Sequence, residues 1–157
     1  MANYQKIWDR ALAPQEELKY EFSISFLYRT FYFGLCLIMG IWLIGMRVYI
    51  AGLGIILLSF FYCYFLIPWS NAFALTNKRV LIHRGWLGSN LISIDYDKIT
   101  DITVEESIID KFITRSGNLI INTAGTGFSE NKQGQKISHI ASPYEVKKKL
   151  DAIRFSQ

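Results

Sequence analysis

Charge is almost missing from the middle of this chain. The 157 residues include 17 Lys or Arg and 13 Asp or Glu, yet none of these lies between Arg29 and Arg47 or between Arg47 and Lys78. A soluble domain scatters its charged residues, roughly 25% of the total, along the whole sequence. The two uncharged stretches therefore exclude an ordinary soluble domain and predict segments that lie in a membrane.

Reactive and metal-ligating side chains are also scarce. The two cysteines, Cys36 and Cys63, lie in separate apolar stretches, where small buried hydrophobic residues are expected. No Cys/His cluster has the spacing of a zinc site. Asp95, Asp97 and Asp101 lack the glycine and the closing glutamate of a calcium loop, so surface and turn roles are favoured. We expect no cofactor, no metal and no enzymatic activity.

Two apolar runs fill the charge-free region. The first covers Thr30 to Met46 and the second covers Val48 to Trp69, with only Arg47 between them. A helix of 17 residues rises roughly 25 Å, and the flanking apolar residues extend it toward the ~30 Å of a hydrocarbon core. Such a short link predicts an antiparallel transmembrane hairpin over residues 30–69. Pro68 is expected to end the second helix.

Basic residues predict the orientation of this hairpin. Arg47 stands alone at the tip, whereas both flanks are richer in basic residues: Lys19, Arg29, Lys78, Arg79 and Arg84. Cytoplasmic segments carry the excess of Lys and Arg in membrane proteins. We therefore expect a multi-pass protein of the plasma membrane with both termini in the cytoplasm.

The leader, residues 1–29, contains two short patterned segments. Tyr4, Ile7, Trp8 and Leu12 form one face of a helix before Pro14, which we interpret as an interfacial helix. Apolar and polar residues alternate from 19 to 25, as in a strand. That strand could pair with the sheet after the hairpin, but the sequence leaves the pairing open.

The rest of the chain, residues 70–157, has a β pattern that ends in a helix. Short apolar runs predict strands near 72–76, 80–82, 91–94, 99–104, 119–123 and 136–140. Residues 107–115 predict a helical turn, and residues 125–135 form a polar, glycine-rich loop. Ser142 and Pro143 then predict the start of a helix over 144–155, with Ser142 as its N-cap.

Ordered motifs in this region are similar to those of a known family. They are a strand ending in LTNKR (75–79), an RGW turn (84–86), an I-x-x-x-K-I-x-x-I segment and a GNLIINTAG strand (117–125). With two apolar helices before them, they resemble the bacterial pleckstrin-homology (PH)-like domain of the YdbS/YdbT membrane-protein type. The resemblance implies an α+β membrane protein, in which a two-helix transmembrane hairpin precedes a PH-like split β-barrel capped by a C-terminal helix. It also implies a bacterial or archaeal plasma membrane.

The functional expectation follows from a small fold without a reactive constellation. We predict a non-catalytic, membrane-anchored interaction module, a scaffold or accessory subunit of a membrane complex at the cytoplasmic face. The alternative is an anionic lipid-headgroup binder, and topology alone could also explain the basic residues. The candidate lipid-contact residues are Trp69, Lys78, Arg79, Arg84 and Trp86.

The expected partners are membrane lipids and either other membrane protein subunits or further copies of this chain. Nucleic acid is not expected as a partner. Proteins that bind nucleic acid concentrate Lys and Arg on one face, whereas the basic residues here lie mostly beside apolar segments.

Overall fold

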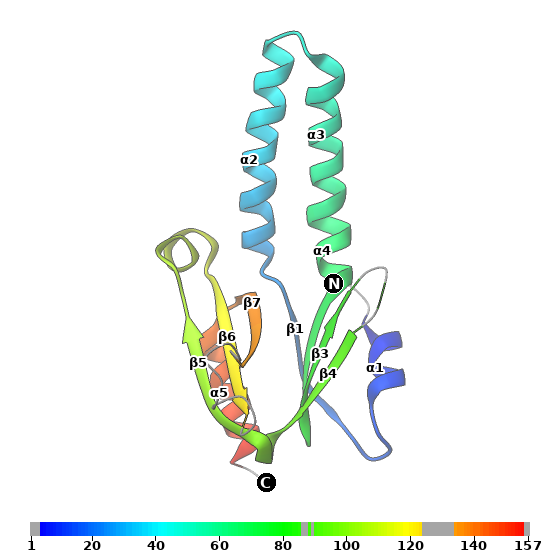
Figure 1. The fold of residues 1–157 in the computed structure, drawn as a ribbon, viewed down its shortest axis with the longest axis vertical. Coiled ribbons are helices and arrows are strands. Elements are labelled where there is room, and N and C mark those ends of the chain that lie inside the picture. The colour runs from blue at the N-terminus through cyan, green and yellow to red at the C-terminus, as the bar shows by residue number, and fades with distance from the viewer. Residues whose placement is uncertain (1–3, 86–87, 89, 124–133, 156–157) are drawn as a thin grey trace.

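A helical hairpin rises from one end of a domain made of two β-sheets (Figure 1). The computed structural model describes residues 4–85, 88, 90–123 and 134–155. The hairpin consists of α2 (Phe26–Gly45) and α3 (Tyr49–Phe61). Arg47 forms the tight turn between them with a left-handed backbone, φ 66°. The predicted pair of helices joined at Arg47 is thus confirmed.

The second helix does not end at Pro68, so this prediction is wrong. The helix continues from α3 through a π-helical turn, η1 (Tyr62–Leu66), and finishes as α4 (Ile67–Ser70). In the π turn the Ile67 N–H donates to the Tyr62 carbonyl, one residue further back than in an α-helix. This wider turn lies directly before the proline, which has no N–H to donate, so the chain passes Pro68 while remaining helical.

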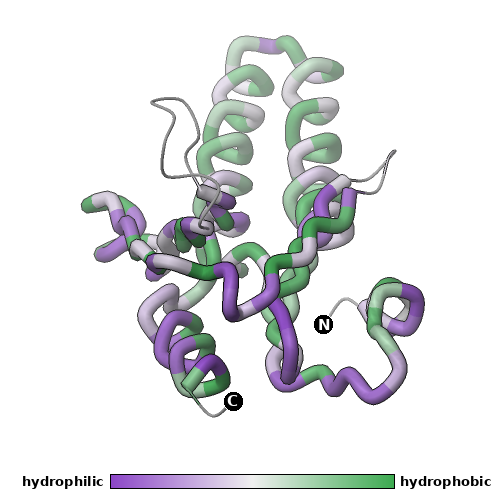
Figure 2. The backbone as a smooth tube through the Cα atoms, turned by 60° about the horizontal axis from the view of Figure 1, so that its bottom comes forward, coloured by the Kyte–Doolittle hydropathy of each residue, from purple (hydrophilic) through white to green (hydrophobic). Residues whose placement is uncertain are grey.

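Both helices of the hairpin are long and apolar enough to cross a membrane. Figure 2 shows them as largely hydrophobic. Their large apolar side chains point outward: Ile38, Ile50 and Leu58 are 66%, 91% and 72% exposed. A core helix of a soluble protein would bury such side chains, because exposing them to water is unfavourable.

Within the described residues, the domain contains seven antiparallel strands in two sheets. The first sheet has the order β1 (Leu18–Ser23), β2 (Asn71–Thr76), β3 (Arg79–Arg84) and β4 (Asn90–Asp95). The second has the order β5 (Ile99–Glu105), β6 (Ser116–Thr123) and β7 (Gln135–Ala141). The 3₁₀ turn η2 (Tyr96–Lys98) joins the sheets, and η3 (Asp110–Thr114) lies between β5 and β6. The predicted strands are confirmed, and the barrel is not closed.

One apolar core lies between the two sheets. Phe73, Ile82 and Ile121 are among its fully buried side chains. Helix α5 (Pro143–Arg154) inserts Val146 and Leu150 into the same core. Ser142 precedes α5 as predicted but does not cap it through its side chain, because its backbone is left-handed (φ 48°) and not extended as an N-cap requires.

The leader is part of the domain. Strand β1 pairs with β2 in an antiparallel register, which answers the question that the sequence left open. Helix α1 (Gln5–Ala11) packs Trp8 against Ala72 and Ala74 on the outer face of the first sheet. The prediction of an interfacial helix is therefore wrong: its apolar face covers the sheet, where two small alanines leave room for an indole that is only 1% exposed.

Candidate functional site

A cleft of about 900 Å³ lies where the hairpin meets the first sheet. Most of its aromatic residues come from the end of the second helix, and the other lining residues come from β1, the start of α2 and Tyr4, which precedes α1. The lining residues are Tyr4, Glu21, Phe22, Ser23, Phe26, Arg29, Phe61, Tyr64, Phe65, Pro68 and Trp69. The lining therefore combines aromatic rings with the polar side chains of Glu21, Ser23 and Arg29, a mixture that suits an amphiphile.

The polar floor of the cleft is fixed by hydrogen bonds. The Tyr4 hydroxyl donates to the Pro68 carbonyl at 2.7 Å and lies 3.1 Å from the Ser23 Oγ. Ser23 in turn donates to the Asn71 carbonyl at 2.8 Å. Burial raises the pKa of the Tyr4 phenol, partly offset by the hydrogen bond with Ser23, so the group remains a neutral donor. These contacts join α1 and β1 to the end of the second helix.

Arg29 brings a positive charge to this cleft. Its guanidinium carbon lies 5.6 Å from the centre of the Phe26 ring. Within the part of the chain that the structure describes, Arg29 Nε is shielded from solvent and has no hydrogen-bond partner. A shielded, unpartnered guanidinium N–H is unfavourable unless an acceptor reaches it. Glu21 also lines the cleft, but no ion pair between these two residues is found among the described residues.

Two of the predicted lipid-contact residues lie at the hairpin end of the domain. Trp69 is in α4, lines the cleft and is 72% exposed. Arg84 ends β3 opposite Asn71, the first residue after the hairpin, and its guanidinium donates to the Lys136 carbonyl. Trp86 lies outside the described residues.

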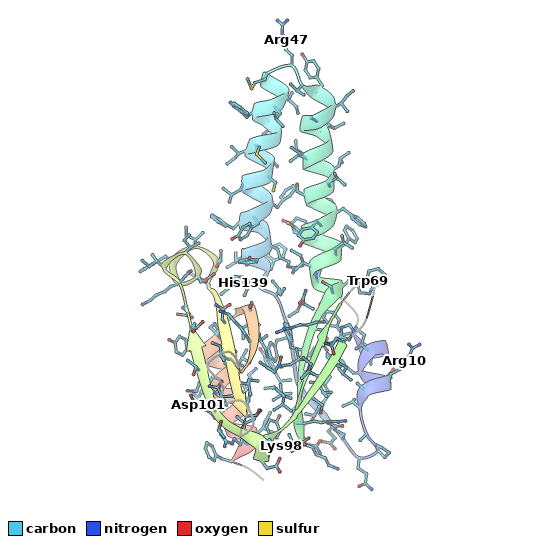
Figure 3. The ribbon with its side chains drawn as sticks, in the orientation of Figure 1. Arg10, Arg47, Trp69, Lys98, Asp101 and His139 are labelled. Carbon is cyan, nitrogen blue, oxygen red and sulfur yellow. The ribbon has the colours of Figure 1, made fainter. Side chains whose placement is uncertain are left out.

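Lys78 and Arg79 lie at the opposite end of the domain, which corrects their predicted proximity to the headgroups. Strand β2 leads away from the hairpin, and its six residues advance about 17 Å before the turn at Lys78. In Figure 3, Trp69 lies at the hairpin end of the domain and Lys98 at the far end. Arg79 is near Lys98, because it pairs in the sheet with Asp95, three residues earlier in the chain. Lys78 is exposed there, whereas Arg79 forms an ion pair with the buried Glu16 at 2.8 Å.

A second polar cluster lies beside the start of α2. The buried Asp110 carboxylate accepts hydrogen bonds from Ser107, Thr114 and Ser116 at 2.7, 3.3 and 3.0 Å. Burial alone would raise the pKa of Asp110, but these hydrogen bonds outweigh it and hold the pKa below its usual value. His139 Nδ1 is 3.9 Å from Asp110, and burial lowers the pKa of this histidine, which favours its neutral form.

This cluster does not have the geometry of a catalytic triad. In a triad, the histidine lies between the serine and the carboxylate and takes the serine proton. Here Ser116 donates directly to Asp110, and the carboxylate lies between the serine and His139. Ser116 is fully buried, so no substrate reaches it. The cluster instead fixes the β5–β6 connection against α2.

The family of the chain follows from comparison with known proteins. A model of the bacterial PH domain family matches residues 25–154. The chain belongs to this family. The match begins just before α2 and ends in α5, so in this family member it takes in the hairpin and strands β2 to β7. The resemblance predicted from the sequence motifs is confirmed, and PH-like domains are generally non-catalytic interaction modules.

Two crystal structures share the fold of this bacterial PH-domain protein. One is a DUF1696 family protein with a PH domain from Shewanella loihica PV-4, with a TM-score of 0.52 and 11% identity over 98% of this chain and 99% of that one. The other is a PH domain from Shewanella amazonensis SB2B, with a TM-score of 0.52 and 12% identity over 98% and 89%. No curated protein matches the chain. At such identities the structures support the fold alone.

Apart from Trp69, sequence reasoning missed the residues that define the cleft. Arg29 carried a signal, because it is a lone charge at the start of an apolar helix, and we interpreted it as a topology determinant but not as part of a binding site. Glu21 and Ser23 of the leader, by contrast, have no signal that would place them beside Phe61 and Phe65, residues that lie about forty positions later.

Proposed function

We propose that this protein is a membrane-anchored, non-catalytic interaction module whose hairpin spans the plasma membrane and holds the PH-like domain at the cytoplasmic face. The observation that carries the proposal is that the hairpin connects two neighbouring strands of the first sheet. It is inserted between β1 and β2, which are hydrogen-bonded neighbours, so both ends of the hairpin enter the domain side by side. The Lys and Arg of the flanks, against Arg47 alone at the tip, favour this orientation.

The base of the hairpin is tied to the domain by further contacts. The Ser25 N–H donates to the His139 carbonyl at 2.7 Å, and the Tyr28 ring stacks on the His139 ring with centroids 3.9 Å apart. On the other helix, the Pro68 carbonyl accepts from Tyr4. These ties favour a domain held at a fixed height and orientation, which suits a subunit that presents one surface to membrane partners.

This role predicts stoichiometric partners in the native membrane. When the full chain is gently extracted from its own membranes, native mass spectrometry should show a discrete complex containing other membrane subunits or further copies of this chain. Replicate extractions in mild detergents that give only a bare monomer would contradict the scaffold role.

The cleft favours a second function, the binding of a phospholipid headgroup. Arg29 has an unpartnered N–H at the polar side of the cleft, and Phe61 and Phe65 line the side toward the membrane. A guanidinium binds phosphate through charge-assisted hydrogen bonds, and the aromatic wall suits the acyl chains. In the proposed orientation the cleft lies at headgroup level, because Arg29 is in the first turn of α2.

Arg29→Gln should therefore weaken the binding of phospholipid to the purified protein at least tenfold, measured as the lipid concentration for half-occupancy. The loss of a charge-assisted hydrogen bond to phosphate is worth about 1.5–3 kcal/mol, and about 1.4 kcal/mol corresponds to one factor of ten. Retention would be measured by native mass spectrometry during titration with phosphatidylglycerol and, separately, with phosphatidylethanolamine, which distinguishes an anionic from a zwitterionic headgroup.

Lys78→Gln is the matched control for this experiment. It removes one positive charge from an exposed side chain at the end of the domain remote from the hairpin. Lipid retention should be unchanged in this variant. Equal losses in the two variants would indicate nonspecific attraction between the basic protein and lipid, and unchanged retention in Arg29→Gln would rule out the cleft as the headgroup site.

A further inference from the structure

The connection between β5 and β6 exposes four large apolar side chains on one short helical segment. Ile108, Ile109, Phe112 and Ile113 are 80%, 54%, 74% and 51% exposed. Other exposed large apolar residues of the described part of the domain, such as Leu91 and Phe155, stand apart from one another along the chain. Scattered exposed residues are normal in soluble proteins, whereas a contiguous apolar patch marks an interaction surface.

The segment buries Asp110 and Thr114 and exposes its large apolar residues. The Asp110 carboxylate accepts hydrogen bonds from Ser107, Thr114 and Ser116. The Lys111 N–H donates to the Ser107 carbonyl at 2.9 Å, which closes the turn. The hydrogen-bonded interior therefore fixes a conformation in which the isoleucines and the phenylalanine point away from the domain. This arrangement is unfavourable in water and suits an apolar medium.

The position of the segment identifies that medium. Segment η3 contacts α2, and the Ser25 Oγ at the start of α2 donates to the Thr114 carbonyl at 3.3 Å. Figure 1 shows the β5–β6 connection reaching up to the level of the lower end of α2. The four apolar side chains thus lie level with the end of the helix that we propose to enter the bilayer.

The charges around the segment fit a lipid surface. Lys111 and Arg115 are exposed on either side of Phe112, and the Lys111 Nζ lies 5.8 Å from the centre of the Phe112 ring. Long basic side chains next to inserted apolar residues extend toward headgroup phosphates. A soluble protein partner would not require the patch to lie level with the end of α2.

We propose that the β5–β6 connection inserts Ile108, Ile109, Phe112 and Ile113 into the cytoplasmic leaflet as a third membrane contact beside the two helices. This inference rests on the proposed anchoring by the hairpin. With this contact, the protein binds the bilayer at two separate places, the hairpin and the η3 segment. Two points of attachment define which face of the domain is directed toward the cytoplasm. The end of the domain that bears the Lys78 turn then points away from the membrane.

The test places a spin label on the full chain in nanodiscs of phosphatidylethanolamine and phosphatidylglycerol. In a background with Cys36 and Cys63 replaced by alanine, single cysteines are introduced by Phe112→Cys, Met39→Cys and Phe155→Cys. Met39 lies in α2 and reports on the hairpin. Phe155 is as exposed as Phe112 but follows α5 at the far end of the domain, so it is the matched control. The measured quantity is the collision rate with oxygen and with a water-soluble nickel chelate.

The label at position 112 should collide severalfold less with the nickel chelate than the label at position 155, and should resemble the label at position 39. If position 112 resembles position 155 while position 39 stays protected, the third contact is wrong and the anchoring stands. That outcome would assign the patch to a protein partner. If position 39 is also open to the chelate, the proposed anchoring itself fails. Ile108→Cys, at a second exposed position of the segment, must give the same result as Phe112→Cys.

Discussion

Glu16→Gln should lower the free energy of unfolding of the two-sheet domain by about 3 kcal/mol. The Glu16 side chain is fully buried and accepts hydrogen bonds from Arg79 Nε at 2.9 Å and Arg79 Nη2 at 2.8 Å. The Thr76 hydroxyl and the Ala13 N–H also donate to it, at 2.7 and 2.9 Å. An amide would turn donors toward the guanidinium and leave Arg79 without its hydrogen-bonded counter-ion, which is the costly way to break a buried pair.

The measurement is denaturant unfolding in a mild detergent, followed by tryptophan fluorescence. Trp8 packs on the first sheet and reports on loss of the domain. Glu17→Gln is the matched control, because the adjacent Glu17 forms an exposed ion pair with Lys19 and should be almost without effect. Equal unfolding free energies for the two variants would show that the Glu16 pair contributes no more than an exposed one.

The same carboxylate predicts loss of stability in acid. Hydrogen bonds from Arg79, opposed by burial, lower the pKa of Glu16 from 4.5 to about 2. A carboxyl whose pKa is lower in the folded state stabilises the fold fully above its unfolded value and loses this contribution as the pH falls. The free energy of unfolding of the wild type should therefore decrease between about pH 4.5 and pH 2 more steeply than that of Glu16→Gln. Parallel pH profiles would contradict the assignment.

The sequence predicted the elements of the fold because each leaves a local signal. Alternation marked most of the strands, and the absence of charge marked the hairpin. Burial on both faces makes β2 and β3 continuous apolar runs in their centres, since the core covers one face and α1 covers the other. A family resemblance then supplied the arrangement of strands, which local signals do not contain.

The place of α1 could not be predicted because periodicity defines an apolar face but not what the face packs against. Tyr4 and Trp8 would suit a bilayer interface as well as a sheet. The complementary signal was the pair of small residues Ala72 and Ala74 on the outer face of β2, about sixty-five positions away. Only the paired register of β1 and β2 brings the leader back to that face.

Of the predicted lipid-contact residues that the structure describes, only two lie at the hairpin end of the domain. Trp69 lies at the hairpin end because it is in the last turn of the second helix, and Arg84 lies there because it pairs with Asn71, the residue after that helix. Their role as lipid contacts stays a prediction. Lys78 and Arg79 were misplaced because their nearness in sequence to the hairpin was taken as nearness in space, whereas a six-residue strand separates them. The pairing of Arg79 with Glu16 joins residues 63 positions apart, which no spacing rule predicts.

The hairpin itself depends on one close contact between its helices. Gly40 and Gly52 are buried where α2 and α3 cross, whereas Gly34, Gly45 and Gly54 have open space around them. A Cβ on Gly40 would meet the side chain of Ile56 and lie 3.0 Å from the Gly52 carbonyl oxygen. A Cβ on Gly52 would lie 2.7 Å from the Gly40 carbonyl oxygen, which is part of a helix backbone and cannot move without separating the helices.

Gly52→Ala should therefore destabilise the packing of the hairpin by about 2 kcal/mol, the usual size of an overpacking penalty. Gly54→Ala is the matched control, because its new methyl group meets nothing within 4 Å and alanine favours a helix. The separation of the helices can be followed in mild detergent titrated with dodecyl sulfate, with Cys36 and Cys63 replaced by alanine. Energy transfer is measured between probes on Ile41→Cys and Leu57→Cys, two outward-facing positions. Gly52→Ala should separate at a lower dodecyl sulfate fraction than the control. Coincident titrations would mean that the two helices do not depend on the crossing at Gly40 and Gly52.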